Sequence, residues 1–196
     1  RIIESSAESM DELPDSSVHL IVTSPPYWNI KDYGNQDQIG FHDSLEDYLD
    51  RLASVWEECY RVLHPGCRMV INVGDQYLSS TEERPYQIMP LNALIVNKVL
   101  EATDWEIIPL GNIIWQKQTN TETSGGACVM GSFGRPRNGY VNYDYEYISI
   151  FKKPGKAPGV PQEIKELDSI PTPEWKELFN GHWNFTGDRQ TEHPAP

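Results

Sequence analysis

An apolar strand that runs directly into two consecutive prolines is the feature that most limits how this chain can fold. Residues 19–23 form the apolar run, and Ser24-Pro25-Pro26-Tyr27 follows at once. Each proline fixes φ near −65° and removes a backbone donor, so a sheet ladder cannot continue through the pair. The carbonyls of Ser24 and Pro25 are then available to accept hydrogen bonds from another group. We therefore expect a strand that ends in a rigid loop carrying acceptors and an aromatic ring.

The residues at the end of this strand suit a planar amino group attached to an aromatic ring. The carbonyls of Ser24 and Pro25 can accept protons from such a group, and Tyr27 can stack on the ring that carries it. This chemistry would hold the exocyclic amine of a base flipped out of a duplex. A plain turn would explain the two prolines, but the flanking Thr-Ser and Tyr-Trp pairs favour a binding site.

The rest of the chain alternates between strand and helix patterns. Ser44 with Asp47 three residues later resembles a capping box, apolar residues then follow at helical spacing, and His64-Pro65-Gly66 breaks the helix. The expected strands cover residues 1–4, 19–23, 68–73, 106–116 and 145–152, and the expected helices cover a short segment to Leu13, residues 45–63 and residues 86–102. We expect the run at 19–23 to be buried on both faces, as in a parallel sheet. The order predicts a doubly wound α/β layer whose last two strands form an antiparallel pair joined by a long loop.

Ser24-Pro25-Pro26-Tyr27 after a strand resembles the catalytic motif of the amino-methylating DNA methyltransferases, in the variant usual for N4-cytosine enzymes. The similarity continues through most of the chain, over residues 49–66, 71–75, 105–117, 143–153 and 183–196. The resemblance implies an α/β fold with the Rossmann-like sheet of methyltransferases that use S-adenosyl-L-methionine (SAM), mostly parallel with an antiparallel closing pair. It also implies the β-type order, in which the catalytic half precedes the cofactor half.

The expected domain boundaries follow from this order. Residues 1–155 are expected to be the catalytic part of a methyltransferase domain, with 119–140 as a candidate DNA-contacting loop. Residues 156–196 are expected to form a surface excursion leading toward a cofactor segment outside this chain. The glycine-rich F-x-G-x-G sequence that would hold the methionine part of SAM does not occur here, and the chain opens at Arg1 without Met. We therefore expect an excerpt of a longer protein.

The residues expected to carry catalysis are Ser24, Pro25, Pro26, Tyr27 and Asp75. Acceptors at Ser24 and the Pro25 carbonyl would draw the amine toward sp³ geometry and free its lone pair, with no covalent enzyme intermediate. Tyr27 would stack on the base. Asp75 follows a strand that should end at the same sheet edge as Ser24, so it could take the proton lost by the methylated nitrogen. The alternative for Asp75 is a turn-forming residue.

Two further groups of residues complete the expected site. Contacts to SAM are expected from Glu4, Ser5, Ser6 and Thr23, although the family more often shows Gly-Asp where Glu4-Ser5 stands. Contacts to DNA are expected from Trp28, Lys31, Arg135 and Arg137. Two alternatives stay open, because Trp28 could equally be a core residue and the loop at 119–140 could simply be mobile.

The composition limits the possible partners. Acidic residues outnumber basic ones by 29 to 16, for a net charge of −13, which argues against a broad phosphate-binding face but allows positive charge on one lip of a cleft. No apolar stretch approaches the roughly 20 residues of a membrane span, so no membrane partner is expected. Cys59, Cys67 and Cys128 show no C-x-x-C spacing, which predicts reduced thiols in a cytoplasm and no zinc or other metal site.

The function implied by the resemblance is SAM-dependent methylation of the N4 amine of a flipped cytosine in double-stranded DNA. A prokaryotic, cytoplasmic enzyme of this kind would partner a restriction endonuclease acting on the same site. N6-adenine methylation is the rival within the same class. A catalytically incomplete half that only binds DNA or a partner chain is the rival from another class, because the glycine-rich segment is missing.

Overall fold

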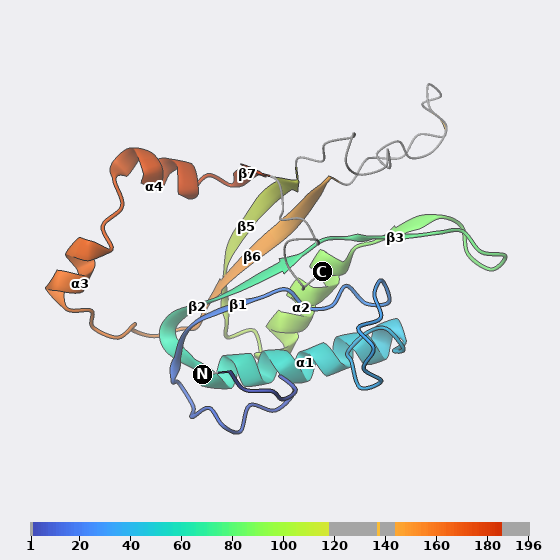
Figure 1. Cartoon of the computed structure of the whole chain (residues 1–196), viewed down its shortest axis with the longest axis horizontal. Coiled ribbons are helices and arrows are strands. Elements are labelled where there is room, and N and C mark those ends of the chain that lie inside the picture. Colours follow the sequence, from blue (N-terminus) through green and yellow to red (C-terminus); the bar gives the residue numbers. More distant parts are fainter. Residues whose placement is uncertain (1, 118–136, 138–143, 186–196) are drawn as a thin grey trace.

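The computed structural model describes residues 2–117, 137 and 144–185. Its main sheet has five strands in the order β1-β2-β6-β5-β7 (Figure 1). β1 (Val18–Thr23) and β2 (Leu63–Val73) are parallel, as are β5 (Ile108–Lys117) and β7 (His182–Phe185). β6 (Tyr145–Lys152) is antiparallel to both β2 and β5. The expected antiparallel closing pair is confirmed. The described sheet is mixed rather than mostly parallel, because β6 lies at its centre and runs antiparallel to both of its neighbours.

Two helices cover one face of this sheet (Figure 1). These are α1 (Leu45–Val62) and α2 (Leu91–Ala102), which also pack against each other. Their buried side chains meet those of the central strands in one hydrophobic core. Its members include Tyr48, Leu52, Trp56 and Cys59 of α1, Leu91, Ile95 and Val99 of α2, Met69, Ile71 and Val73 of β2, and Phe151 of β6. The core therefore fixes the strand ends against α1 and α2.

The start of α1 matches the expected capping box, but its end lies earlier than the pattern indicates. The Ser44 hydroxyl accepts a hydrogen bond from the Asp47 amide over 3.1 Å. The helix ends at Val62 and β2 begins directly at Leu63, so His64-Pro65-Gly66 lies inside a strand. Gly66 has φ +81°, and a Cβ added there would lie 2.1 Å from the backbone nitrogen of Ala157. Glycine is required at this close approach of two backbones.

Three other expectations about local structure are wrong. Residues 2–4 form no strand, and the segment that ends at Leu13 folds as turns rather than as a helix. Residues 87–89 form β4 (Gln87–Met89), which pairs with β3 (Gln76–Leu78) in a separate two-stranded sheet, and α2 begins only at Leu91. Pro90 explains this late start, because proline has no amide and disfavours helical backbone at the residue before it.

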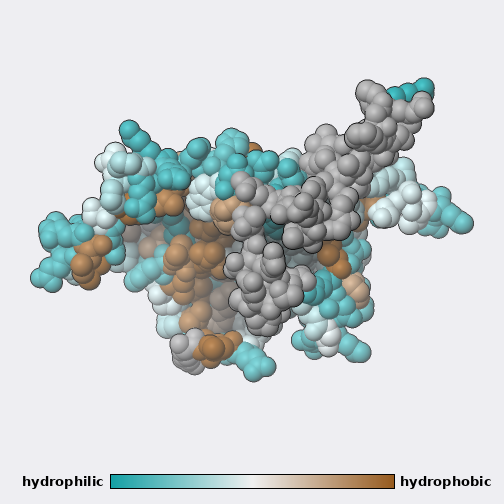
Figure 2. Space-filling model, turned by 45° about the horizontal axis from the view of Figure 1, so that its top comes forward, coloured by the Kyte–Doolittle hydropathy of each residue, from teal (hydrophilic) through white to brown (hydrophobic). Residues whose placement is uncertain are grey.

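β1 is not buried on both faces. Leu20 and Val22 are 58% and 69% exposed, because no described element covers the side of the sheet opposite the two helices. Leu110 of β5 is also exposed. Figure 2 turns the top of Figure 1 forward and shows hydrophobic residues gathered near the middle of that side. The expectation failed because the apolar run predicts a strand but does not say which layers cover it.

A long excursion separates β6 from β7. It contains α3 (Gln162–Leu167) and α4 (Thr172–Leu178), neither of which has a buried residue, and it stands away from the sheet in Figure 1. β7 then returns to pair with β5. The division of the chain at residue 155 stays a prediction. Among the described residues, no helix is both long and apolar enough to cross a membrane.

Candidate active site

The Ser-Pro-Pro-Tyr sequence forms the loop that leaves the carboxyl end of β1. Ser24 is exposed, Pro25 is buried, and Pro26 and Tyr27 are half-buried. The hydroxyl of Tyr48, fully buried on α1, donates a hydrogen bond to the carbonyl of Pro26 over 2.6 Å. The double-proline turn is therefore fixed from the core helix below it, which keeps its position constant relative to the sheet.

The residues after the motif form an ordered loop rather than a free one. Trp28 has φ +49°, packs against the core, and donates from Nε1 to the Asp43 carbonyl over 3.0 Å. A Cβ on Gly40, which has φ +105°, would lie 2.8 Å from the Trp28 carbonyl oxygen, so glycine is needed where the loop crosses itself. The structure thus shows Trp28 with a packing role, and its contact with DNA stays a prediction.

One guanidinium ties this loop to the rest of the molecule. Arg51 of α1 donates to the carbonyls of Asp37 and Gln38 over 2.8 and 3.0 Å. It also pairs with the carboxylates of Glu8 and Asp43 at 2.9 and 3.2 Å. Arg51 therefore joins the segment before β1 to the loop after the motif.

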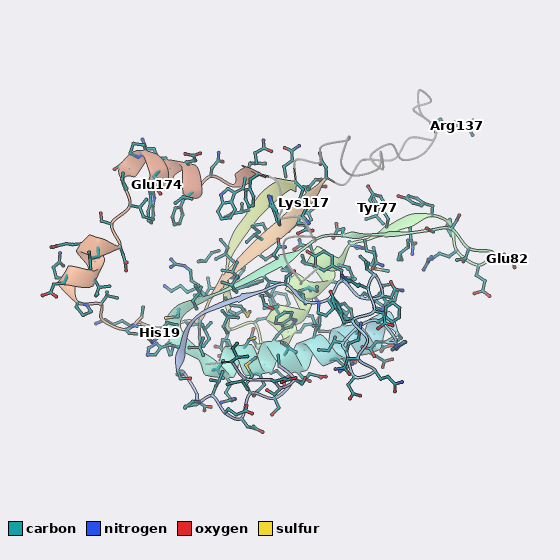
Figure 3. The ribbon with its side chains drawn as sticks, viewed as in Figure 1. His19, Tyr77, Glu82, Lys117, Arg137 and Glu174 are labelled. Atoms are coloured by element: carbon teal, nitrogen blue, oxygen red, sulfur yellow. The ribbon has the colours of Figure 1, made fainter. Side chains whose placement is uncertain are left out.

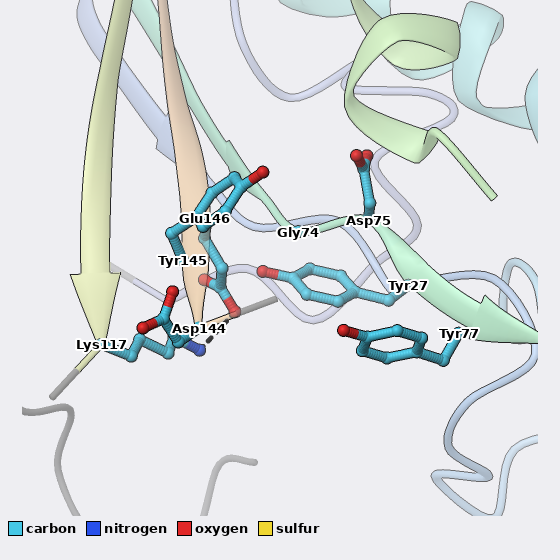
Figure 4. A pocket seen from close by; sticks show the side chains of 8 residues that line it. All are labelled: Tyr27, Gly74, Asp75, Tyr77, Lys117, Asp144, Tyr145 and Glu146. Carbon is cyan, nitrogen blue, oxygen red and sulfur yellow. Dashed lines mark hydrogen bonds and ion pairs between the residues drawn. The ribbon is translucent and has the colours of Figure 1, made fainter. Parts of the chain in front are cut away.

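A pocket of about 240 Å³ opens beside the motif (Figure 4). Its lining comes from the carboxyl ends of β1, β2 and β5, from the start of β6 and from β3. The lining residues are Tyr27, Gly74, Asp75, Tyr77, Lys117, Asp144, Tyr145 and Glu146. The strand before Asp75 ends at the same sheet edge as Ser24, as predicted, because β1 and β2 are parallel. In α/β proteins this edge is where ligands bind.

Polar side chains line the inner wall of the pocket. Glu146 is only 8% exposed, and its carboxylate accepts from the amide of Asn72 over 2.8 Å and forms an ion pair with Lys117. The same Asn72 amide donates to the Tyr27 hydroxyl over 3.4 Å. Burial, reinforced by the nearby charge of Glu146, raises the pKa of Tyr27. The Tyr27 hydroxyl therefore stays protonated at neutral pH and can act as a donor.

Gly74 makes room for this arrangement. A Cβ added at Gly74 would lie 3.0 Å from Cγ of Glu146 and 3.5 Å from Cε2 of Tyr27. The missing side chain lets the tyrosine ring and the carboxylate approach each other directly beside the end of β2.

Asp75 has a structural partner as well as a place in the pocket. Its Oδ1 accepts a hydrogen bond from the backbone amide of Asn92 in the first turn of α2, over 3.0 Å. The Asn92 side chain in turn accepts from the Ser149 hydroxyl of β6 over 3.1 Å. Asp75 thus satisfies one of the amides that a helix start leaves without an intrahelical partner.

The remaining predicted residues do not line the pocket. Glu4, Ser5 and Ser6 are exposed, and the Ser6 hydroxyl donates to Glu8. Thr23 is half-buried at the end of β1, and Lys31 is exposed with its ammonium 5.7 Å from the centre of the Tyr33 ring. Arg137 is exposed and lies well away from Lys117 in Figure 3. Arg135 and nearly all of the loop at 119–140 lie outside the described residues. The binding roles of these residues stay predictions.

Sequence analysis did not identify six of the residues that line the pocket, nor Asn72 behind it; the six are Gly74, Tyr77, Lys117, Asp144, Tyr145 and Glu146. Asn72 and Glu146 are polar residues inside apolar strands, and Lys117 ends such a strand, which were signals that each faces something polar. Tyr77 gave no comparable signal, because the short β3–β4 pair has no clear alternation. Within the described residues, no group of three or more histidine, cysteine, aspartate and glutamate side chains could hold a metal ion.

Fold and site together define an α/β protein with a ligand pocket at the carboxyl ends of its strands. The family model for DNA methylases of the N6 and N4 type matches residues 18–195. The chain belongs to this DNA methylase family.

Two curated relatives cover nearly the whole chain. It is 30% identical to the type II methyltransferase M.MthZI of Methanothermobacter thermautotrophicus over 97% of this chain and 56% of that protein. It is 32% identical to the type II methyltransferase M.MjaI of Methanocaldococcus jannaschii over 99% of this chain and 69% of that protein. The chain therefore spans about half to two thirds of the length of these relatives.

Solved structures agree on the fold. A DNA modification methylase from Thermus thermophilus, TTHA0409, solved in complex with S-adenosyl-L-methionine, superposes with a TM-score of 0.66 at 32% identity, covering 88% of this chain and 62% of that one. The cytosine-N4-specific PvuII DNA methyltransferase superposes with a TM-score of 0.53 at 17% identity, covering 91% of this chain and 54% of that one. At that identity the PvuII match supports the fold alone.

Proposed function

We propose that the protein to which this chain belongs is a SAM-dependent DNA methyltransferase that methylates the exocyclic N4 amine of a flipped cytosine. The observation that carries the proposal is the Ser24–Tyr27 loop, fixed by Tyr48 at the carboxyl end of β1 beside a pocket lined by Tyr27. Membership of the N6/N4 DNA methylase family supports DNA amino methylation in general. The serine at the first motif position favours cytosine, as in the family variant described above.

In this proposal the chain positions the amine and does no covalent chemistry. Ser24 and the Pro25 carbonyl accept hydrogen bonds from the amino group, which frees the nitrogen lone pair for in-line attack. Tyr27 stacks on the base, and Pro26 keeps the loop rigid. Asp75 takes the proton released by the methylated nitrogen, directly or through water.

SAM, when bound, supplies an electrophilic methyl group. The chain's proposed contacts to it are Glu4, Ser5, Ser6 and Thr23. The first three are exposed and offer carboxylate and hydroxyl oxygens, which suit the hydroxyl and amino groups of an adenosine. We propose that the remaining cofactor contacts come from the part of the protein that this chain does not span. The structure of TTHA0409 was solved in complex with SAM, which supports the cofactor assignment.

The proposed partner is double-stranded DNA, contacted by Trp28, Lys31, Arg135 and Arg137. A cognate restriction endonuclease acting on the same site follows from the similarity to type II methyltransferases. Such an enzyme would work in the cytoplasm of a prokaryote. Flipping of the target base would bring its amine to the acceptors at Ser24 and Pro25.

Methylation of duplex DNA with labelled SAM tests the proposal. The full-length protein is incubated with mixed-sequence duplex, and the nucleosides are separated after digestion. We expect label on N4-methylcytosine. Label only on N6-methyladenine would replace the base assignment, and label on C5 of cytosine would overturn the mechanism. A protein that binds DNA but transfers no label would fit the rival function, an incomplete DNA-binding half.

A further inference from the structure

Tyr77 lines the same pocket as Tyr27 but comes from a different element. It is the middle residue of β3, opposite Ile88 of β4. Its neighbours Gln76 and Leu78 are buried, at 6% and 4% exposure, whereas Tyr77 is half-buried. Since successive strand residues point to opposite sides, burial of these two neighbours turns the Tyr77 ring toward the pocket.

Two contacts fix the position of this strand. The Gln76 side chain donates from Nε2 to the Asn29 side-chain oxygen over 2.7 Å, which links β3 to the loop just after Tyr27. The Tyr77 ring lies 6.0 Å from the Tyr86 ring with an interplanar angle of 32°. The position of Tyr77 relative to Tyr27 is therefore fixed in the protein without substrate.

The rings of Tyr27 and Tyr77 line the same pocket. Figure 4 shows the Tyr27 and Tyr77 rings one beyond the other with similar tilt, and the side chains of Lys117, Asp144 and Glu146 together to one side. A planar aromatic ligand between the rings would bury both faces and would direct its polar edge toward the charged side chains. Nucleobases have this combination of flat faces and a polar edge.

We propose that Tyr77 is the second stacking wall of the pocket and sandwiches the flipped base against Tyr27. The inference rests on the proposed function, because it assigns a residue that contacts the DNA base in the methylation reaction. Two aromatic walls would stabilise the extruded base against its return to the duplex. Stacking of this kind does not distinguish one base from another, so Tyr77 would set how long the base stays in the pocket rather than which base is chosen.

Steady-state methylation kinetics of Tyr77 variants test this role. In the full-length protein, Tyr77→Ala is expected to lower kcat/KM for duplex DNA by about 5- to 150-fold, the range for loss of one base–aromatic stack. Tyr77→Phe and Tyr77→Trp are expected to stay within about threefold of the wild type. Tyr77→Leu, which replaces the ring by an apolar side chain, is expected to resemble Tyr77→Ala. The matched control is Trp175→Ala, which removes an exposed aromatic ring of α4 and is expected to leave kinetics unchanged.

A second duplex separates stacking from a purely structural role. When the partner of the methylated base is replaced by a mismatch, extrusion costs less and more of the bound base is already extruded, so the defect of Tyr77→Ala in kcat at saturating duplex is expected to shrink. An equal loss of kcat on matched and mismatched duplex, or wild-type kinetics for Tyr77→Leu, would overturn the inference. If Tyr77→Ala fails to fold by circular dichroism, Tyr77→Leu carries both measurements. Normal methylation by wild type and variants alike would overturn only the Tyr77 role, whereas no methylation by the wild type would overturn the proposed function and this inference with it.

Discussion

Asn72 of β2 donates a hydrogen bond to the carboxylate of Glu146 on β6 over 2.8 Å. The same amide reaches the hydroxyl of Tyr27, so one side chain links the motif loop to two central strands. Because Glu146 is almost fully buried, its hydrogen bond with Asn72 takes the place of hydrogen bonds to water. The aromatic ring proposed to hold the base is therefore positioned by the interior of the sheet.

Loss of the Glu146 carboxylate should destabilise the protein. Glu146→Ala leaves the Asn72 amide and Lys117 without their shared acceptor, and an unsatisfied buried donor costs about 1–3 kcal/mol. Glu146→Gln keeps an acceptor and should cost less. The measurement is urea unfolding at pH 7, with exposed Glu163→Ala of α3 as the control. Equal stability of all three variants would show that the buried carboxylate contributes nothing.

Removal of the Tyr27 ring should weaken substrate binding more than removal of its hydroxyl. Tyr27→Ala is expected to weaken binding of duplex with a mismatched cytosine by about 1–3 kcal/mol, the value of a base–aromatic stack. Tyr27→Phe keeps the ring and loses the hydrogen bonds of the hydroxyl, which include those with Asn72 and Glu146, so its affinity for the base should stay close to wild type. Fluorescence anisotropy of labelled duplex measures both. Wild-type affinity for Tyr27→Ala would transfer the stacking role to another aromatic residue.

Substitutions of Asp75 separate its structural role from the proposed catalytic one. Asp75→Ala removes the acceptor for the Asn92 amide and should cost about 0.5–2 kcal/mol of stability, as for loss of a helix cap. Asp75→Asn keeps an acceptor and should unfold near the wild-type midpoint. If Asp75 takes the proton, Asp75→Asn lowers kcat while stability is kept. Wild-type kcat in this variant would exclude the proposed proton transfer and leave Asp75 with a structural role.

Glu58 should make stability fall in acid. Hydrogen bonds from Arg61 and from the Met10 amide lower the pKa of Glu58 to about 2. Because the folded pKa lies below the unfolded value near 4.5, the stabilisation is complete above pH 4.5 and is lost as pH falls toward 2. Urea midpoints of the wild type minus those of Glu58→Gln should therefore shrink over this window. The control is Glu57→Gln, an exposed neighbour whose difference from wild type should stay constant.

Much of the fold and part of the site can be predicted from the sequence. The strand at 19–23, the Ser44 cap, the antiparallel closing pair and the position of Asp75 at the same sheet edge as Ser24 all follow from the sequence. The mixed sheet does not follow, because the place of β6 between β2 and β5 depends on long-range pairing. Burial of β1 also does not follow, since periodicity describes the strand and not the layers above it.

The linked polar side chains beside Tyr27 could not be predicted for a related reason. Asn72, Lys117 and Glu146 lie on three different strands, and only the sheet order places β2, β6 and β5 side by side. For Asp75 the position at the sheet edge could be predicted, but the hydrogen bond from the Asn92 amide of α2 could not. Contacts between segments that are distant in the sequence thus cannot be predicted from one sequence.

The contacts of Arg51 have a consequence for the proposed association with DNA. A loop that is free in solution must lose conformational entropy when it docks, and each ordered side chain costs roughly 0.5–1.5 kcal/mol. Arg51 holds the carbonyls of Asp37 and Gln38 before any partner arrives, so the loop that presents Lys31 has already lost much of that freedom. Part of the conformational entropy that the loop would lose on binding is thus already lost when the protein folds. In the proposed complex this loop would meet DNA as a preorganised surface, and the affinity gained there would depend on Arg51, a helix residue that itself touches no substrate.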